Sequence, residues 1–401
     1  MSLLPSGWII SSIEESMEAI IDYRGKTPSK TTFGIPLITA KIIGDGQIAE
    51  PNEFIAEEDY LAWMRRGLPK VGDVLITTEA PLGEVAQLSF DKVALAQRVI
   101  LLRGKPGKLD NAYLKHVLQY RTVQEQLRAK ATGSTVLGIK QSELRKVVLP
   151  LPPLEEQHRI AAILDKADAI RRKRAEAIRL TEELLRAAFL DMFGDPVVNP
   201  KGWEIIPMHK VIEKIEAGWS ANGEEQPCKK DEWGVLKISA VTSGRFQPHE
   251  NKVVKNIPPN KSLIIPKRGD LLFGRANTRE LVAATCLVEN SYERLFLPDK
   301  LWRIIPNPKF ANTEYLRFLL SEPKYRGLLA RKATGTSGSM LNVSQQKLLE
   351  MDAPIPHLDK QNYFAEVVWK IFGIRERLES AYNESNCIFN SLLHCAFRGE
   401  L

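Results

Sequence analysis

An internal duplication is the feature that most limits the fold of this 401-residue chain. KVGDVLITTEAPLGEVA (residues 70–86) aligns without a gap on KRGDLLFGRANTRELVA (residues 267–283), 197 positions later. Three shorter motifs also recur: GIPLITA (34–40) as GVLKISA (234–240), KATG (130–133) as KATG (332–335), and GW (7–8) as GW (202–203). This period is far longer than the roughly 20–50 residues of a solenoid repeat. The sequence therefore predicts two copies of one globular module, with two similar sites.

The composition is that of an ordinary globular protein, with 44% hydrophobic and 26% charged residues. The sequence contains no apolar run of about 18 residues, the length of a membrane-spanning helix, and no recognisable signal peptide. A cytoplasmic protein is therefore expected. The four cysteines lack the paired spacing of a zinc site or disulfide framework. A net charge of +7 permits a polyanionic partner without requiring one.

Each half of the chain is predicted to contain strands and turns followed by one long helix. Residues 154–193 contain no Pro or Gly and end at Gly-Asp-Pro, a typical helix stop. A second run extends to residue 397 with Gly373 as its only glycine. We therefore predict a first module over 1–152, a central spacer helix over 153–195, a second module over 196–355 and a C-terminal spacer helix over 356–401.

Both long runs carry an apolar heptad seam, which a stable helix must bury. In the first run the seam residues are Ile160, Ile163, Ala167, Ile170 and Leu184, interrupted by the polar Arg174 and Thr181. In the second they are Phe364, Val367, Ile371, Ile374, Leu378, Ile388 and Leu392, interrupted by Ser385. The predicted fold is α+β: two similar mixed α/β modules separated by two long helices packed as an antiparallel coiled coil. Alternatively, each helix packs on its own module.

Catalytic and metal-binding motifs are missing from the sequence. GKT at residues 25–27 lacks the earlier glycine of a phosphate loop, and the six histidines form no HExxH pair. Asp73 and Asp270 recur, but each follows a Gly before a strand, where a turn-forming role is typical. We therefore predict neither an enzyme nor a metal site.

The most distinctive motif is ATGSTVLGIKQSELRKVVLPLPPLEEQHRIAAIL (131–164), in which PLPPLEEQ leads into the long helix. It occurs with YRGKTP (23–28), LAQR (95–98), FGDP (193–196) and AFRGEL (396–401). With these motifs the chain resembles, along nearly its whole length, the specificity subunit of type I restriction–modification systems. The second module departs from the pattern, since its junction is APIPHLDKQ and its strand loop is GRANTREL. Such divergence is expected if the modules recognise different half-sites.

The resemblance implies a non-catalytic, DNA-binding subunit with two target-recognition domains, one for each half of a bipartite double-stranded target. The spacer helices of that family dock methyltransferase subunits, of which two are expected here, and a restriction/motor subunit joins through the complex. S-adenosylmethionine and ATP are expected only on those partners, so no cofactor is expected on this chain. The helix pair would hold the half-sites about one DNA turn, roughly 34 Å, or a multiple of it apart.

Polar residues on loops after the matched strands are the candidates for DNA contact under this resemblance, because base edges are recognised by such side chains. In the first module they are Thr77, Thr78, Glu79, Gln97, Arg98, Thr132, Ser134 and Lys140. In the second they are Arg275, Asn277, Thr278, Arg279, Lys300, Thr334, Thr336 and Ser337.

These features also have interpretations that do not involve DNA contact. The candidate residues could be solvated loop residues, and the Gly-Ser-Thr loops at 132–135 and 334–339 could be flexible turns. The basic cluster at 171–174 could face DNA, an acidic surface of the methyltransferase, or solvent. The whole chain could also be a tandem-repeat scaffold that binds protein; salt-dependent DNA binding would separate this alternative.

Overall fold

The computed structural model describes residues 5–23, 27–335 and 340–401. The chain forms two compact units: unit 1 comprises residues 1–175 and 380–401, and unit 2 comprises residues 176–379. Unit 1 contains the first module and unit 2 the second. Among the described helices, none has the length and apolar character needed to cross a membrane.

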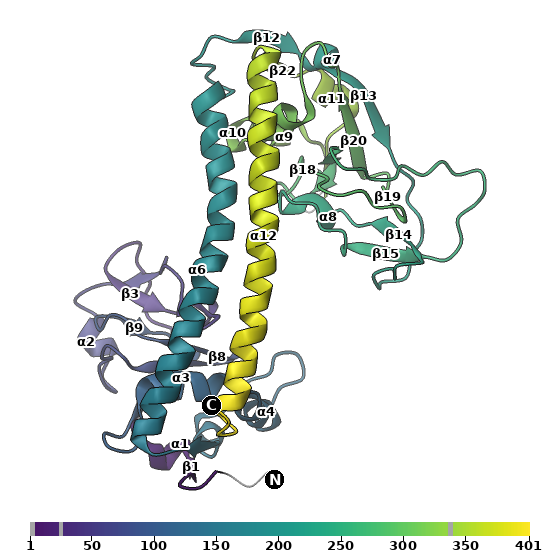
Figure 1. Ribbon diagram of the computed structural model, residues 1–401. Helices are drawn as coiled ribbons and strands as arrows, with labels where there is room; N and C mark the ends of the chain where they lie inside the picture. The colour runs from purple at the N-terminus through teal and green to yellow at the C-terminus, as the bar shows by residue number, and fades with distance from the viewer. Residues whose placement is uncertain (1–4, 24–26, 336–339) are drawn as a thin grey trace. The chain divides into compact units, whose positions relative to one another are not determined.

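Module 1 is a mixed α/β structure of short elements. In chain order (Figure 1) these are β1 (Ile9–Ser12), α1 (Ile13–Ser16), β2 (Met17–Asp22), β3 (Ile35–Ile38), a 3-10 turn (Ala40–Ile42), β4 (Ile43–Gly44), β5 (Gln47–Ile48), β6 (Phe54–Ile55), α2 (Tyr60–Trp63), β7 (Val74–Thr78), β8 (Leu82–Gln87), β9 (Ala94–Leu95), β10 (Val99–Gly104), α3 (Asn111–Gln119), α4 (Arg121–Ala129), α5 (Gln141–Leu144) and β11 (Val148–Leu151).

The central sheet of module 1 is buried on both faces, which explains why its strands are continuous apolar runs. Its antiparallel strand order is β2-β10-β7-β8. On β7, Val74 and Ile76 pack in one core with α3, while Leu75 between them packs in a second core under β3, β6 and β9. Side chains alternate across a strand, so one strand serves both cores.

Module 2 repeats this architecture. Its elements are β12 (Glu204–Pro207), α7 (Met208–Val211), β13 (Ile212–Ala217), β14 (Trp233–Leu236), α8 (Ser239–Thr242), β15 (Asn251–Val254), β16 (Leu271–Gly274), β17 (Ala276–Asn277), β18 (Thr285–Leu287), β19 (Leu295–Phe296), β20 (Leu301–Pro306), α9 (Thr313–Ser321), α10 (Pro323–Lys332), β21 (Leu341–Asn342), α11 (Gln345–Leu349) and β22 (Asp352–Ile355). Its central sheet has the order β13-β20-β16-β18, which is the order of the module 1 sheet.

The repeated Gly-Asp dipeptide closes the same turn in both modules. Gly72 has φ +88° and Gly269 has φ +89°, a region that favours glycine. The carboxylate of Asp73 accepts from the backbone N–H of Lys70 at 2.8 Å, and that of Asp270 accepts from Lys267 at 2.8 Å. Both aspartates therefore form turns, as the sequence analysis interpreted them.

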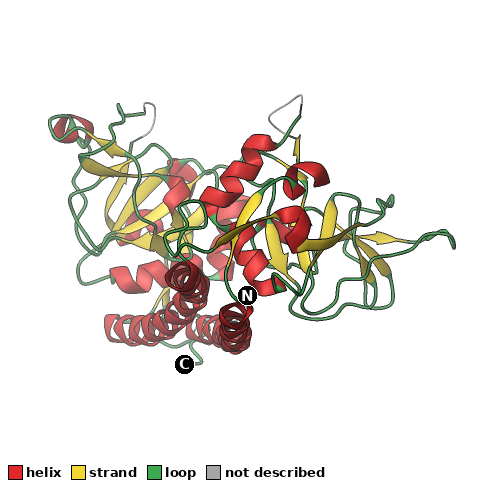
Figure 2. Ribbon diagram, turned by 90° about the horizontal axis from the view of Figure 1, so that it is seen from above, coloured by secondary structure: helices red, strands yellow, loops and turns green. Residues whose placement is uncertain are grey.

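Two helices of 40 and 39 residues, α6 (Leu154–Phe193) and α12 (Leu358–Ala396), complete the fold. In unit 1, Arg159 lies near residue 401 and Arg174 contacts Ser385, so α6 and α12 are antiparallel. In unit 2, Phe193 packs edge-on against Phe364, and Glu182 is ion-paired with Arg375, with the same antiparallel sense. In each unit the long helices lie along one side of the strands (Figure 2). The predicted fold class is thus confirmed.

The glutamine of each module–helix junction explains why this motif is so distinctive. Gln157 is buried and donates to the carbonyls of Lys108 and Pro152, while accepting from the N–H of Asp110. Gln361 makes the three matching bonds in module 2, with Phe310, Pro356 and Asn312. A buried amide satisfied at three points fixes where the long helix begins.

The line of buried residues on the helices differs from the predicted seam. Ile160, Phe364 and Ile371 are buried, and Ile163, Ala167, Val367, Leu378 and Leu392 are half-buried. Ile170, Leu184, Ile374 and Ile388 are instead exposed, by 45%, 56%, 44% and 57%. The most buried positions lie mainly one residue later, at Ala161, Leu164, Asp168, Leu185, Phe189, Val368, Phe372, Arg375, Phe389 and Leu393.

The displacement arises because each helix packs on its own module as well as on the other helix. Leu164 and Phe389 belong to the core of module 1, and Phe189 and Phe372 to that of module 2. The most buried face of each helix therefore lies between the other helix and the module, and not on the two-helix seam alone. Both packing alternatives raised by the sequence operate together.

Candidate functional site

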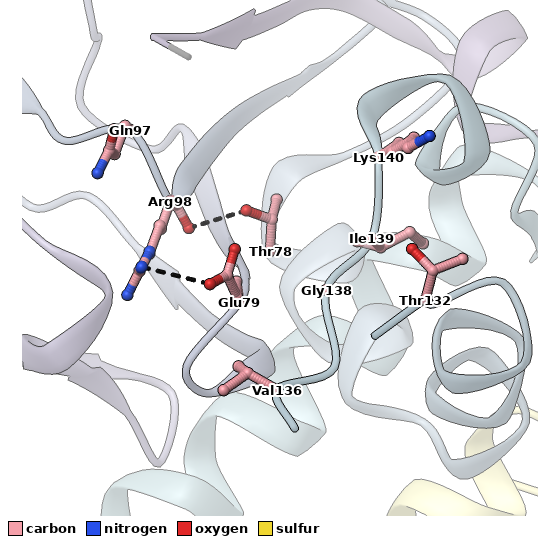
Figure 3. Close-up of a pocket in the computed structure, with 9 residues that line it drawn as sticks. All are labelled: Thr78, Glu79, Gln97, Arg98, Thr132, Val136, Gly138, Ile139 and Lys140. Atoms are coloured by element: carbon pink, nitrogen blue, oxygen red, sulfur yellow. Dashed lines mark hydrogen bonds and ion pairs between the residues drawn. The ribbon is translucent and has the colours of Figure 1, made fainter. Parts of the chain in front are cut away.

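Module 1 has an open cleft where β7 ends and β10 begins, with a volume of about 490 Å³. Figure 3 shows Thr78, Glu79, Gln97 and Arg98 on one side and Thr132, Ile139 and Lys140 on the other. Val136 and Gly138 complete the lining. Six of the residues predicted from the sequence therefore lie together: Thr78, Glu79, Gln97, Arg98, Thr132 and Lys140.

Backbone hydrogen bonds hold the two sides of this cleft. The N–H of Thr78 donates to the carbonyl of Arg98 at 2.9 Å, and the N–H of Ile139 donates to the carbonyl of Thr78 at 3.0 Å. Thr132 and Gly138 exchange two bonds of 2.9 Å that close the loop between them. We call this set of main-chain bonds the backbone frame. It positions the lining side chains without using their functional groups.

The side chains of the cleft carry both signs of charge. Arg98 Nη2 lies 3.3 Å from Glu79 Oε1, and these side chains are 47% and 40% exposed. The Thr78 hydroxyl donates to the carbonyl of Arg98 at 3.3 Å, which adds to the hold on this residue. Lys140 is exposed on the opposite side. The cleft thus offers amide, hydroxyl, guanidinium and ammonium donors together with one carboxylate acceptor.

Two of the predicted module 1 residues do not line the cleft. Thr77 is fully buried, and its hydroxyl accepts from the N–H of Glu84 at 2.9 Å, because its side chain lies on the opposite face of strand β7 from that of Thr78. We therefore remove Thr77 from the candidate site. Ser134 is exposed on the loop that Thr132 and Gly138 close.

Module 2 repeats the backbone frame bond for bond. The N–H of Arg275 donates to the carbonyl of Lys300 at 3.1 Å, and the N–H of Val343 donates to the carbonyl of Arg275 at 2.8 Å. Thr334 and Asn342 exchange bonds of 2.9 and 2.8 Å. Arg275 therefore takes the place of Thr78, Lys300 that of Arg98, and Thr334 that of Thr132.

The side chains on this second frame differ from those on the first. Arg275 Nη2 lies 3.3 Å from Asp299 Oδ2. The order of charges is therefore reversed: the arginine follows β16 and the aspartate precedes β20, whereas in module 1 Glu79 follows β7 and Arg98 precedes β10. Partial burial opposes ionisation of Asp299, but hydrogen bonds from Ser220 and Arg275 outweigh it and lower the pKa. Asp299 was missed from the sequence, although it stands before β20 as Gln97 stands before β10.

The remaining candidates of module 2 are Asn277, Thr278, Arg279, Thr336 and Ser337. Asn277 and Thr278 are partly exposed, and the Asn277 side chain accepts from the N–H of Thr278 at 2.8 Å. Arg279 is exposed. Thr336 and Ser337 lie outside the described residues.

The cleft offers hydrogen-bond donors and acceptors of both charges for binding. Across the described part of the chain, no group of three or more His, Cys, Asp or Glu side chains could hold a metal ion. Donors and acceptors set on a rigid frame at an open cleft can instead recognise the edges of bases.

The basic cluster at 171–174 is engaged within unit 1. Arg171 and Arg172 pair with Asp168, and Arg172 also donates to the carbonyl of Gly46 at 3.1 Å. Arg174 donates to Ser385 and to the carbonyl of Ala381 on α12. Arg171 and Arg172 thus join α6 to the 45–46 turn of module 1, and Arg174 joins α6 to α12, so the solvent-facing interpretation of the cluster fits only Lys173, which is exposed.

The chain is similar in sequence to proteins of type I restriction–modification systems. The sequence model described as "Type I restriction modification DNA specificity domain" matches residues 5–180. The EcoKI specificity subunit of Escherichia coli strain K12 is 24% identical over 430 aligned positions, which cover 99% of this chain and 90% of that protein. The EcoEI specificity subunit of Escherichia coli is 29% identical over 190 positions, which cover 46% of this chain and 31% of that protein.

Among solved structures, the type I restriction–modification S subunit from M. genitalium aligns with a TM-score of 0.56. The alignment covers 99% of this chain and 98% of the other, at 14% sequence identity. At this identity the likeness concerns the fold.

Proposed function

The chain belongs to the specificity subunits of type I restriction–modification systems, and we propose that it recognises a bipartite double-stranded DNA target, one half with each module. Specificity subunits are the non-catalytic, DNA-recognising members of these systems. On this proposal the chain supplies recognition, and separate methyltransferase and restriction/motor subunits supply the chemistry.

The observation that carries this proposal is the repeated backbone frame with different side chains. Thr78 and Arg98 in module 1 correspond to Arg275 and Lys300 in module 2 through matching main-chain bonds. A repeated frame presents side chains to DNA in the same geometry, and a changed set of donors and acceptors selects different bases. Two modules of this kind suit two half-sites of different sequence.

Exposed apolar residues on the helices support docking of two copies of one partner. Ile170 and Ile374, 204 positions apart, are 45% and 44% exposed, while Leu184 and Ile388, also 204 apart, are 56% and 57% exposed. Unit 1 therefore carries Ile170 with Ile388, and unit 2 carries Ile374 with Leu184. We assign these two equivalent residue pairs to the docking of two methyltransferase subunits, because apolar side chains exposed at equivalent positions of a duplicated chain suit one partner that binds twice.

The long helices would set the distance between the half-sites. Deleting four residues, about one helical turn, from both α6 and α12 should retain both half-sites and shorten the unspecified centre of the target by roughly one or two base pairs. An unchanged centre would show that the helices do not determine the spacing. S-adenosylmethionine and ATP would bind the partners, and the complex would work in the cytoplasm.

The test is to express the chain with its methyltransferase partner in cells and to map methylated adenines across the genome. A bipartite motif that disappears when this chain is omitted supports the proposal. The purified complex should also lose DNA affinity steeply as salt rises. A protein-binding scaffold, the alternative, would give neither the motif nor salt-dependent DNA binding.

A further inference from the structure

A carboxylate in a cleft that binds DNA needs a physical reason, because it repels the phosphates of the backbone. Glu79 lines the module 1 cleft and is 40% exposed, so its charge is not hidden. We propose that Glu79 and Arg98 together recognise one G·C base pair in the half-site of module 1. This inference rests on the proposed function and specifies the base pair that this cleft selects.

Both members of the pair are held at the edge of the cleft. The carbonyl of Arg98 accepts from the N–H of Thr78 at 2.9 Å and from the Thr78 hydroxyl at 3.3 Å. Glu79 follows directly after β7, whose end pairs with β10. In Figure 3 the two charged groups meet on the same side of the cleft, opposite Lys140.

The chemistry of the pair matches a G·C edge in the major groove. Guanine presents two acceptors, O6 and N7, which suit an Arg guanidinium, and the paired cytosine presents the N4 amino donor, which suits a Glu carboxylate. One guanidinium nitrogen of Arg98 is occupied by Glu79, and among the described residues its other N–H groups have no hydrogen-bond partner. The guanidinium of Arg98 can therefore donate to O6 and N7 of guanine, while the neighbouring carboxylate of Glu79 accepts from N4 of the paired cytosine.

Other base pairs fit this arrangement worse. An A·T pair offers Arg98 a single N7 acceptor beside the adenine amino group, and it offers Glu79 the thymine O4, which is itself an acceptor. A carboxylate facing an acceptor gains no hydrogen bond and keeps its desolvation cost. We expect about ten- to hundredfold discrimination, the range of one well-formed bidentate contact.

The experiment uses the full chain co-expressed with its methyltransferase partner, with genome-wide mapping of methylated adenines. The variants are Arg98→Gln and Glu79→Gln. The matched control is Arg121→Gln, which breaks an exposed Arg121–Glu125 pair of 2.7 Å in the same module. Thermal unfolding of each purified complex shows that the variants are folded, and if one fails to fold, the other carries the test.

The wild-type motif should contain a G·C pair in one half that Arg98→Gln or Glu79→Gln relaxes, while every other position stays fixed. Methylation of the original site should fall about ten- to hundredfold relative to sites altered at that pair. The control should leave the motif unchanged. A folded variant with an unchanged motif, or with equal loss at all sites, overturns the inference, since the latter indicates a phosphate contact. Absence of any bipartite motif in the wild type would refute the proposed function instead.

Discussion

Arg375 of α12 is ion-paired with Glu182 of α6, and the Arg375 side chain is only 1% exposed. Its guanidinium also pairs with Glu289 of module 2 and lies 4.4 Å over the Phe372 ring. One buried cation therefore joins both long helices and the module in unit 2. Partners that compensate a buried charge become unsatisfied when it is removed.

Arg375→Leu should destabilise unit 2 by about 1–3 kcal/mol, because the ion pairs of the buried guanidinium are lost while Glu182 and Glu289, 35% and 26% exposed, stay partly solvated. Replacing both glutamates by Gln in the same chain should restore part of the loss. Chemical denaturation followed by circular dichroism measures these changes. Arg377→Leu is the control, since Arg377 is exposed on the same helix. Equal effects of the two substitutions would show that the buried ion pairs contribute little.

Unit 1 should lose stability as pH falls below about 6.5, the ordinary pKa of histidine. Burial lowers the pKa of His116, whose Nε2 lies 2.8 Å from Asp165 while its buried Nδ1 has no partner. The unfolded chain therefore binds a proton more readily than the folded one, and acid favours unfolding. His116→Phe, which introduces the residue found at the equivalent Phe318 of module 2, should reduce the change in melting temperature between pH 7 and 5. His158→Gln, an exposed change on α6, should not.

A second acid-dependent loss is expected at lower pH. Burial opposes ionisation of Asp165, but hydrogen bonds from His116 and Lys115 outweigh it and lower the pKa to about 2. The stability from this carboxylate is complete above its ordinary pKa of 3.8 and is lost as pH falls toward 2. Asp165→Asn should remove this part of the acid transition, which calorimetry at successive pH values can follow.

Ile170→Asp together with Ile388→Asp should abolish association of a methyltransferase subunit with unit 1 while the chain stays folded. Both side chains are about half exposed, so the charges stay in water and folding loses little. Co-purification and analytical ultracentrifugation count the bound subunits, and we expect one in place of two. Leu180→Asp is the control, because this exposed leucine corresponds to Glu384, 204 positions later. Retention of both subunits would locate the docking surface elsewhere.

Cys286 should resist alkylation in the folded protein, because complete burial raises the pKa of its thiol to about 12 and excludes the reagent. Cys387 is exposed and should react at once. Mass spectrometry of iodoacetamide-treated protein distinguishes the two peptides. Labelling of Cys286 only in denaturant would make it a probe of module 2 opening; rapid native labelling would contradict its burial.

The sequence was sufficient to predict the architecture because duplication, helix length and junction motif are local patterns. It also grouped six residues of the module 1 cleft, since each follows or precedes a matched strand. It could not place Thr77, whose burial depends on which face of β7 its side chain takes, or Asp299, whose role depends on pairing with Arg275 across two strands. The buried face of each long helix differs from the predicted seam, because heptad spacing indicates only the face that meets the other helix. Packing against the module buries residues on an adjacent face as well.

The backbone frame has a consequence for how such proteins diverge. Main-chain bonds that hold Thr78 and Arg98 in place are indifferent to side-chain identity, as Arg275 and Lys300 demonstrate at the same positions. Substitutions at these points can therefore accumulate with little penalty in folding. If the cleft recognises DNA as proposed, exchange of exposed residues on this frame, such as Arg98, alters the recognised sequence while the scaffold stays the same.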